Sequence, residues 1–146
     1  MALNSIHTHA GPDTVFDVLD DACAYPRWVV GARRVRGVDP SWPAVGSRFH
    51  HALGTAAGEL HDSSKVVERD RPRRMVLEVR FRPAGVAEVE INVVPHADGS
   101  TIVMVERPIS GPLAKVPGFL LEPLLKLRNA LSLQRLRHEI EQPRAG

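Results

Sequence analysis

Residues 117–142 read PGFLLEPLLKLRNALSLQRLRHEIEQ and form the one long segment of this chain whose pattern predicts a helix. Apolar residues recur in it at the four-three-four spacing of one helical face: Leu120, Leu124, Leu127 and Leu131. A second apolar stripe lies on a neighbouring face and consists of Leu125, Leu136 and Ile140. A helix of about 25 residues with so broad an apolar surface is expected to bury it against a large partner. Pro123 either opens this helix or bends it one turn in.

Most of the chain before residue 117 alternates apolar and polar residues, which predicts β-strands. The alternation is cleanest in residues 75–82, where one face carries Met75, Leu77, Val79 and Phe81. Further strands are expected at 3–9, 33–38, 46–53, 59–68, 87–93 and 101–107. The turns between them are short, and Asp98-Gly99 is typical of a hairpin. Consecutive strands with short turns predict an antiparallel sheet with one apolar and one charged face.

Two short helices, within residues 13–19 and 22–29, are expected between the first two strands. A strongly twisted sheet curls around a single helix rather than lying flat. The predicted fold is therefore of the α+β class: a curled antiparallel sheet of six to seven strands around a long C-terminal helix. Since such a sheet and one helix fill the space between them poorly, we expect a cavity lined by both. Its rim is expected at Trp28 and at the loops around Trp42, Pro83 and Gly111.

Length and composition exclude several classes of protein. A chain of 146 residues predicts one domain over 1–146. Its apolar runs fall short of the ~18 residues that a membrane helix needs, and its N-terminus lacks the pattern of a secretory signal. The single Cys23 excludes an internal disulfide and a cysteine-based zinc site, so a cytoplasmic location is expected. Few apolar residues are expected to face outward, which favours a monomer or weak homodimer.

Charge does not indicate a nucleic-acid partner. The net charge is only +2, because 19 basic residues are interspersed with 17 acidic ones. The one locally basic run, RDRPRR at 69–74, contains an aspartate and a turn proline, so we expect a charged loop there. His7 and His9 share a strand face without an evident third ligand, and the adjacent His50 and His51 point to opposite faces. No metal site and no cofactor are expected.

The order of elements and four segments of the sequence carry a family resemblance. The segments are GPDTVFDVLDDACAYPRWVVG (11–31), WPAVGSRFHHALG (42–54), DGSTIVMVERPISGP (98–112) and LRNALSLQRLRHEIE (127–141). Together they resemble the polyketide cyclase/dehydrase branch of the SRPBCC superfamily, whose START-like members have the helix-grip fold. That fold hosts lipid carriers, hormone receptors and aromatases, so the resemblance implies a fold without choosing among these functions.

Polar residues on the predicted cavity face are the candidates for chemistry. His51 shares strand parity with Phe49 and Leu53, so in the cavity it would act as a general base or hydrogen-bond a ligand carbonyl. The alternatives are a buried histidine bonded to a neighbour, or a strand register that turns His50 inward instead. Asp62 shares the parity of Leu60, and inside an apolar cavity its pKa would be raised. The alternative for Asp62 is a solvent-facing or surface-paired carboxylate. These two residues are the candidate catalytic groups.

The helix contributes polar groups of its own. Arg128 lies between the two apolar stripes and is expected to pair with Asp62 or Glu106, or else to bind a ligand's carboxylate. Asn129 lies on the second stripe and needs a polar partner. The strand that carries Glu106 is apolar on both faces, so its side is left open. The predicted ligand-binding residues are Trp28, Phe49, His51, Asp62, Ser64, Leu77, Val79, Phe81, Val89, Ile91, Val103, Val105, Leu124, Arg128 and Asn129.

Three functions are compatible with this pattern. The first is a binding module that holds a hydrophobic, lipid-like or polyketide-like small molecule in the cavity. The second is a polyketide cyclase or aromatase, in which His51 and Asp62 move protons. The third is a non-catalytic interaction protein whose cavity is filled by its own side chains. The absence of a convergent catalytic set favours the first.

Overall fold

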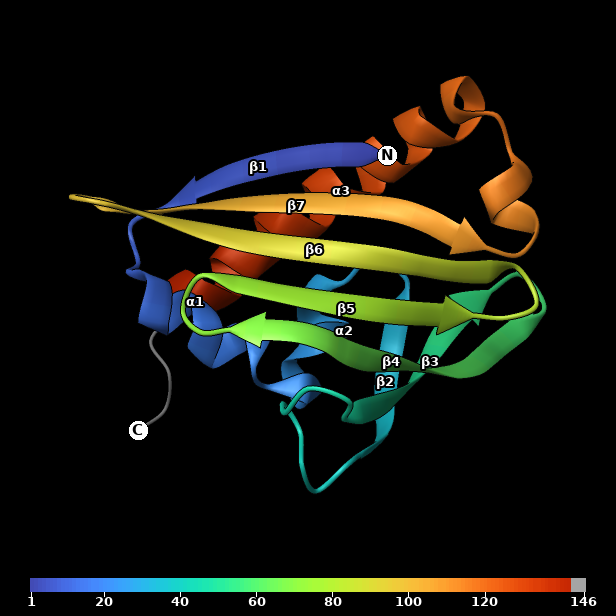
Figure 1. Cartoon of the computed structure of the whole chain (residues 1–146), viewed down its shortest axis with the longest axis horizontal. Helices are drawn as coiled ribbons and strands as arrows, with labels where there is room; N and C mark the ends of the chain where they lie inside the picture. The colour runs from blue at the N-terminus through green and yellow to red at the C-terminus, as the bar shows by residue number, and fades with distance from the viewer. Residues whose placement is uncertain (143–146) are drawn as a thin grey trace.

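Seven strands form one antiparallel sheet that curls around the C-terminal helix in the computed structural model, which describes residues 1–142 (Figure 1). The strands are β1 (Ala2–Thr8), β2 (Ala32–Val38), β3 (Arg48–Thr55), β4 (Gly58–Asp70), β5 (Arg74–Phe81), β6 (Gly85–His96) and β7 (Gly99–Ser110). The helices are α1 (Pro12–Leu19), η1 (Ala22–Ala24), α2 (Tyr25–Trp28), η2 (Pro112–Lys115) and α3 (Gly118–Glu141). The predicted helix-grip fold is confirmed.

The sheet order is β1-β7-β6-β5-β4-β3-β2, so each strand from β2 to β6 pairs with the next one along the chain. β1 returns to pair with β7, which leaves β1 and β2 as the two edges. α3 crosses the concave face and lies beside β1, where the side-chain amide of Asn4 donates to the carbonyl of Lys126 over 3.0 Å. The sheet therefore wraps α3 from one side only.

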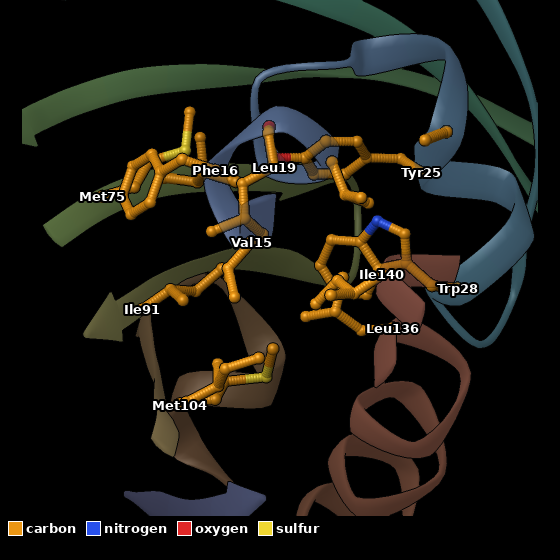
Figure 2. Packing of buried hydrophobic residues seen from close by; sticks show 14 of the residues in the cluster. Val15, Phe16, Leu19, Tyr25, Trp28, Met75, Ile91, Met104, Leu136 and Ile140 are labelled. Carbon is orange, nitrogen blue, oxygen red and sulfur yellow. The ribbon is translucent and has the colours of Figure 1, made fainter. Parts of the chain in front are cut away.

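The hydrophobic core lies where α1, α2 and the second half of α3 meet the sheet (Figure 2). Phe16 and Leu19 of α1 are fully buried, and they pack in one cluster with Met75 of β5 and Leu136 of α3. Burying each such side chain contributes about 2 kcal/mol. Trp28 belongs to the same cluster, so the short helices close one end of the molecule.

The side of α3 that faces the sheet is opposite to the side that the leucine spacing predicts to be buried. Leu120, Leu124, Leu127 and Leu131 are all exposed, so the prediction that this stripe is buried is wrong. The buried residues of α3 all lie from the middle of the helix onward: Asn129, Ser132, Leu133, Leu136 and Ile140. Figure 1 shows the first turns of α3 projecting beyond the edge of the sheet. Pro123 lies inside the helix, which begins at Gly118.

The basic run at residues 69–74 serves the fold itself. The guanidinium groups of Arg69 and Arg71 each lie 2.7 Å from the carboxylate of Asp20, just after α1. Arg71 also bonds Asp17 over 2.9 Å. These ion pairs tie the β4–β5 turn to α1, as expected for a charged loop. Within residues 1–142, no helix is long and apolar enough to cross a membrane.

Candidate functional site

A cavity of about 400 Å³ lies between the concave face of the sheet and α3. Its wall is mainly apolar, because the inward residues of β3 to β7 alternate with charged residues that point outward. The following predicted ligand-binding residues lie on this wall: Trp28, Phe49, His51, Ser64, Leu77, Val79, Phe81, Val89, Ile91, Arg128 and Asn129. Side chains within residues 1–142 leave this space open, which favours the binding module over the interaction protein with a filled cavity.

Loops border the cavity at the surface. The exposed residues on its wall are Gly31, after α2, and Gly54 and Thr55, at the β3–β4 hairpin. At the β5–β6 turn and η2, Ala84 and Leu113 line it, near the rim expected at Pro83 and Gly111. Trp42 is not on this wall, because its ring packs against Phe49 at 5.0 Å and its indole N–H donates to the carbonyl of Asp20 over 2.8 Å.

His51 is buried on β3, and both of its ring nitrogens are engaged. Nε2 lies 3.0 Å from the carbonyl oxygen of Arg80, which can only accept, so Nε2 carries the proton. Nδ1 lies 3.2 Å from the hydroxyl of Ser64, which then donates to it. Burial lowers the pKa of His51, against the raising effect of the Arg80 carbonyl and of Asp62. The imidazole is therefore neutral at pH 7 and locked in one tautomer, which is the alternative of a buried histidine bonded to its neighbours.

Asp62 is not on the cavity wall, and its expected raised pKa is wrong. Its carboxylate accepts hydrogen bonds from Arg82 through the backbone N–H at 3.0 Å, Nε at 3.1 Å and Nη2 at 3.0 Å, and from the backbone N–H of Ser63 at 2.9 Å. Burial alone would raise the pKa of Asp62, but the bonds from Arg82 and Ser63 outweigh it and lower the pKa. Asp62 is thus an ionised anchor for the end of β5.

Glu106 is the carboxylate that β7 places in the cavity. Its side chain is only 6% exposed, and its Oε1 lies 3.4 Å from Nη1 of Arg128, whose side chain is 37% exposed. Nε of Arg128 donates to the carbonyl of Val30 over 3.1 Å, which fixes the guanidinium against the α2–β2 loop. Of the two partners expected for Arg128, Glu106 is the one it has. Within residues 1–142, Nη2 of Arg128 has no hydrogen-bond partner in the protein.

Two further donors belong to cavity-wall residues and are also unpaired. The indole N–H of Trp28 and the side-chain amide nitrogen of Asn129 are buried, and neither has a partner within residues 1–142. Both residues lie on the cavity wall. Ser132 lies one turn further along α3, and its hydroxyl oxygen accepts a hydrogen bond from the backbone N–H of Val30 over 3.1 Å. Trp28 of α2 and Asn129 of α3 therefore each bring a buried donor without a protein partner to the cavity wall.

Besides Asp62, three predicted wall residues point elsewhere. Val103 and Val105 alternate with Ile102, Met104 and Glu106 along β7, and it is Met104 and Glu106 that line the cavity. The two valines therefore face the outer side of the sheet. Leu124 is on the exposed side of α3, whereas its neighbour Leu125 lines the cavity.

Among the wall residues that sequence reasoning did not assign, the most consequential is Glu106. Its parity with Ile102 and Met104 was the available signal, but Val103 and Val105 made the opposite face equally apolar. Leu125 and Ser132 lie one turn either side of Asn129, and the turn spacing of the helix was the signal for them. No group of three or more histidine, cysteine, aspartate or glutamate residues within 1–142 has the arrangement to hold a metal ion.

A family model described as "Polyketide cyclase / dehydrase and lipid transport" matches residues 4–141, and the chain belongs to this family, within the SRPBCC superfamily. Solved structures share the fold at low sequence identity. A Chromobacterium violaceum protein superposes with a TM-score of 0.72 at 19% identity, over 97% of both chains. No curated protein matches the chain.

Two further solved structures share the fold. The crystal structure of Ara h 8.0201 superposes with a TM-score of 0.72 at 10% identity, over 94% of this chain and 95% of that one. The di-domain ARO/CYC StfQ from the steffimycin biosynthetic pathway has a TM-score of 0.71 at 13% identity, over 93% of this chain and 48% of that one. At these identities the likeness establishes the helix-grip fold alone.

Proposed function

We propose that this protein binds a hydrophobic small molecule, lipid-like or polyketide-like, in the cavity between the sheet and α3. The observation that carries the proposal is an apolar-walled space of about 400 Å³ that is bordered by exposed loop residues. Ligand pockets commonly span about 300–1,000 Å³. A ligand that buries about 300 Å² of apolar surface gains on the order of 7 kcal/mol before the loss of its own freedom is subtracted.

The polar groups on the α3 side select among apolar ligands. Arg128 has an unused N–H group, and Trp28 and Asn129 add buried donors without partners. A buried donor left unpaired costs about 1–3 kcal/mol, so a ligand oxygen that accepts from it is favoured. The ligand that fits best is therefore an apolar skeleton with a carbonyl or hydroxyl oxygen directed at α3, rather than a plain hydrocarbon.

A second candidate, a polyketide cyclase or aromatase, is favoured by the carboxylate of Glu106 on an otherwise apolar wall. The catalytic groups would differ from those predicted, because both nitrogens of His51 are engaged and Asp62 is bound by Arg82. Glu106 would move the proton and Arg128 would hold the substrate oxygen. Conversion of an aromatic polyketide precursor by wild type, and not by Glu106→Gln, supports this candidate; equal conversion by both removes it.

The binding proposal is tested by filling the cavity. Val79→Trp places an indole on the β5 wall, and Leu125→Trp does so from α3, in case the first variant does not fold. Val94→Trp, on the exposed outer side of β6, is the matched control. Displacement of a fluorescent apolar dye by fatty acids and aromatic ketones should weaken more than about tenfold in the filled variants, which is about 1.4 kcal/mol, and stay unchanged in the control. Equal affinity in all the proteins would overturn the proposal.

A further inference from the structure

The outer side of α3 carries an apolar surface that nothing within residues 1–142 covers. It consists of Phe119, Leu120, Leu124, Leu127 and Leu131, each between 43% and 77% exposed, and is called here the outer leucine stripe. Successive leucines are four, three and four residues apart, so they follow one side of the helix. The stripe presents on the order of 500 Å² of apolar surface, near the upper end for the largest patch on a monomer. Such a surface marks an interaction site.

Unpaired basic residues lie on α3 and on η2 just before it, the segment that carries the outer leucine stripe. Lys115, Lys126, Arg135 and Arg137 are exposed, and none of them has a carboxylate partner in the described part of the chain. Of the three carboxylates of α3, two are engaged elsewhere, and Glu141 lies at the end of the helix, ten residues beyond Leu131. Glu122 pairs with the N-terminal amine over 3.4 Å, and Glu139 pairs with Arg27 over 3.0 Å.

The outer leucine stripe and the cavity lie on opposite sides of α3. Leu125 and Arg128 line the cavity from the same turns that present Leu124 and Leu127 outward. Leu113 of η2, just before α3, lines it as well. A surface that received the stripe would therefore lie beside the α3 wall of the cavity and the loops next to it.

We propose that the outer leucine stripe docks the protein on an anionic lipid bilayer. A second copy of this chain is the weaker partner, because a symmetric contact brings each patch against itself, and here that sets one cationic rim against another. A bilayer with anionic headgroups accepts convex apolar side chains into its interface and attracts the surrounding lysine and arginine residues. The contact is peripheral and needs no spanning helix. Exchange of a ligand with the bilayer rests on the proposed function, but docking itself does not.

Vesicle co-sedimentation tests this assignment. The protein should sediment with vesicles that contain phosphatidylglycerol and only weakly with pure phosphatidylcholine, and added salt should release it. Leu124→Ser/Leu127→Ser should reduce the bound fraction at least about tenfold, and Lys126→Glu/Arg135→Glu should reduce it on the anionic vesicles alone. Val67→Ser/Val94→Ser, which removes apolar residues exposed on the strands, is the control and should bind as wild type.

The docking proposal would be overturned if the protein sedimented with neither kind of vesicle, or if the leucine substitutions left vesicle binding intact. It would also be overturned if light scattering showed a dimer that Leu124→Ser/Leu127→Ser converts to a monomer. The last would assign the stripe to a second copy. Dye binding to the cavity should persist in the leucine variant, and vesicle binding should persist in Val79→Trp. Failure of dye binding in wild type would remove the proposed function and leave docking standing, so the two failures are distinguishable.

Discussion

Replacing Arg128 by leucine is expected to lower the free energy of unfolding by about 2 kcal/mol. The substitution keeps the helix propensity but leaves the carboxylate of Glu106, only 6% exposed, without its counter-ion. Breaking a fully buried ion pair typically costs about 3–5 kcal/mol. The expected value is smaller because Arg128 is 37% exposed and the Nη1–Oε1 distance is 3.4 Å, so water already solvates part of the pair.

Urea unfolding followed by tryptophan fluorescence measures this change. Arg135→Leu, on the exposed side of the same helix, is the matched control and should shift stability by less than about 0.5 kcal/mol. Adding Glu106→Gln to Arg128→Leu removes the stranded charge and should recover about half of the loss. A loss in Arg128→Leu no larger than that in Arg135→Leu, or no recovery in the double variant, would refute the inference that a buried carboxylate depends on Arg128.

Two further predictions concern the cavity wall and its rim. Because the folded state lowers the pKa of His51, the contribution of this residue to stability is complete above about pH 6.5, which is its pKa in the unfolded chain. That contribution is lost as the pH falls through the pKa of the folded state. Melting temperatures should therefore drop less between pH 7.5 and 5 in His51→Gln than in wild type, and parallel curves for the two proteins would refute this. Gly111 has φ +84°, and a Cβ there would lie 2.5 Å from Cα of Gly85, so Gly111→Ala should cost about 1–3 kcal/mol in thermal unfolding. Gly118→Ala, where a Cβ meets nothing within 4 Å, should be near neutral, and equal losses would contradict the role of the close approach at the rim.

The alternation of apolar and polar residues was sufficient to predict which residues of most strands point to the inner side of the sheet. Met75, Leu77 and Val79 alternate with charged or outward residues, and only one register buries them. The short turns and the single long helix then leave little choice of topology. The cavity follows from this geometry, which is why its β5 and β6 walls could be predicted residue by residue.

The remainder of the site depended on information that periodicity does not contain. The first half of α3 is apolar on two sides, so the spacing of Leu120 and Leu124 cannot tell which side meets the sheet; the sheet extends only far enough to cover the second half. β7 is apolar on both faces, which hid the inward direction of Glu106. The partner of Asp62 is Arg82, 20 residues away, and only the register of β4 and β5 brings them together.

The most direct test of the binding cavity uses the two tryptophans as separate reporters. Trp28 lies on the cavity wall and Trp42 does not, so Trp42→Phe and Trp28→Phe each leave one indole. Titration with a brominated long-chain alcohol, whose bromine quenches only at close range, should saturate at one ligand per protein and quench Trp28 far more than Trp42. Absence of saturable quenching at Trp28, or equal quenching of the two indoles, would contradict an apolar molecule bound between the sheet and α3.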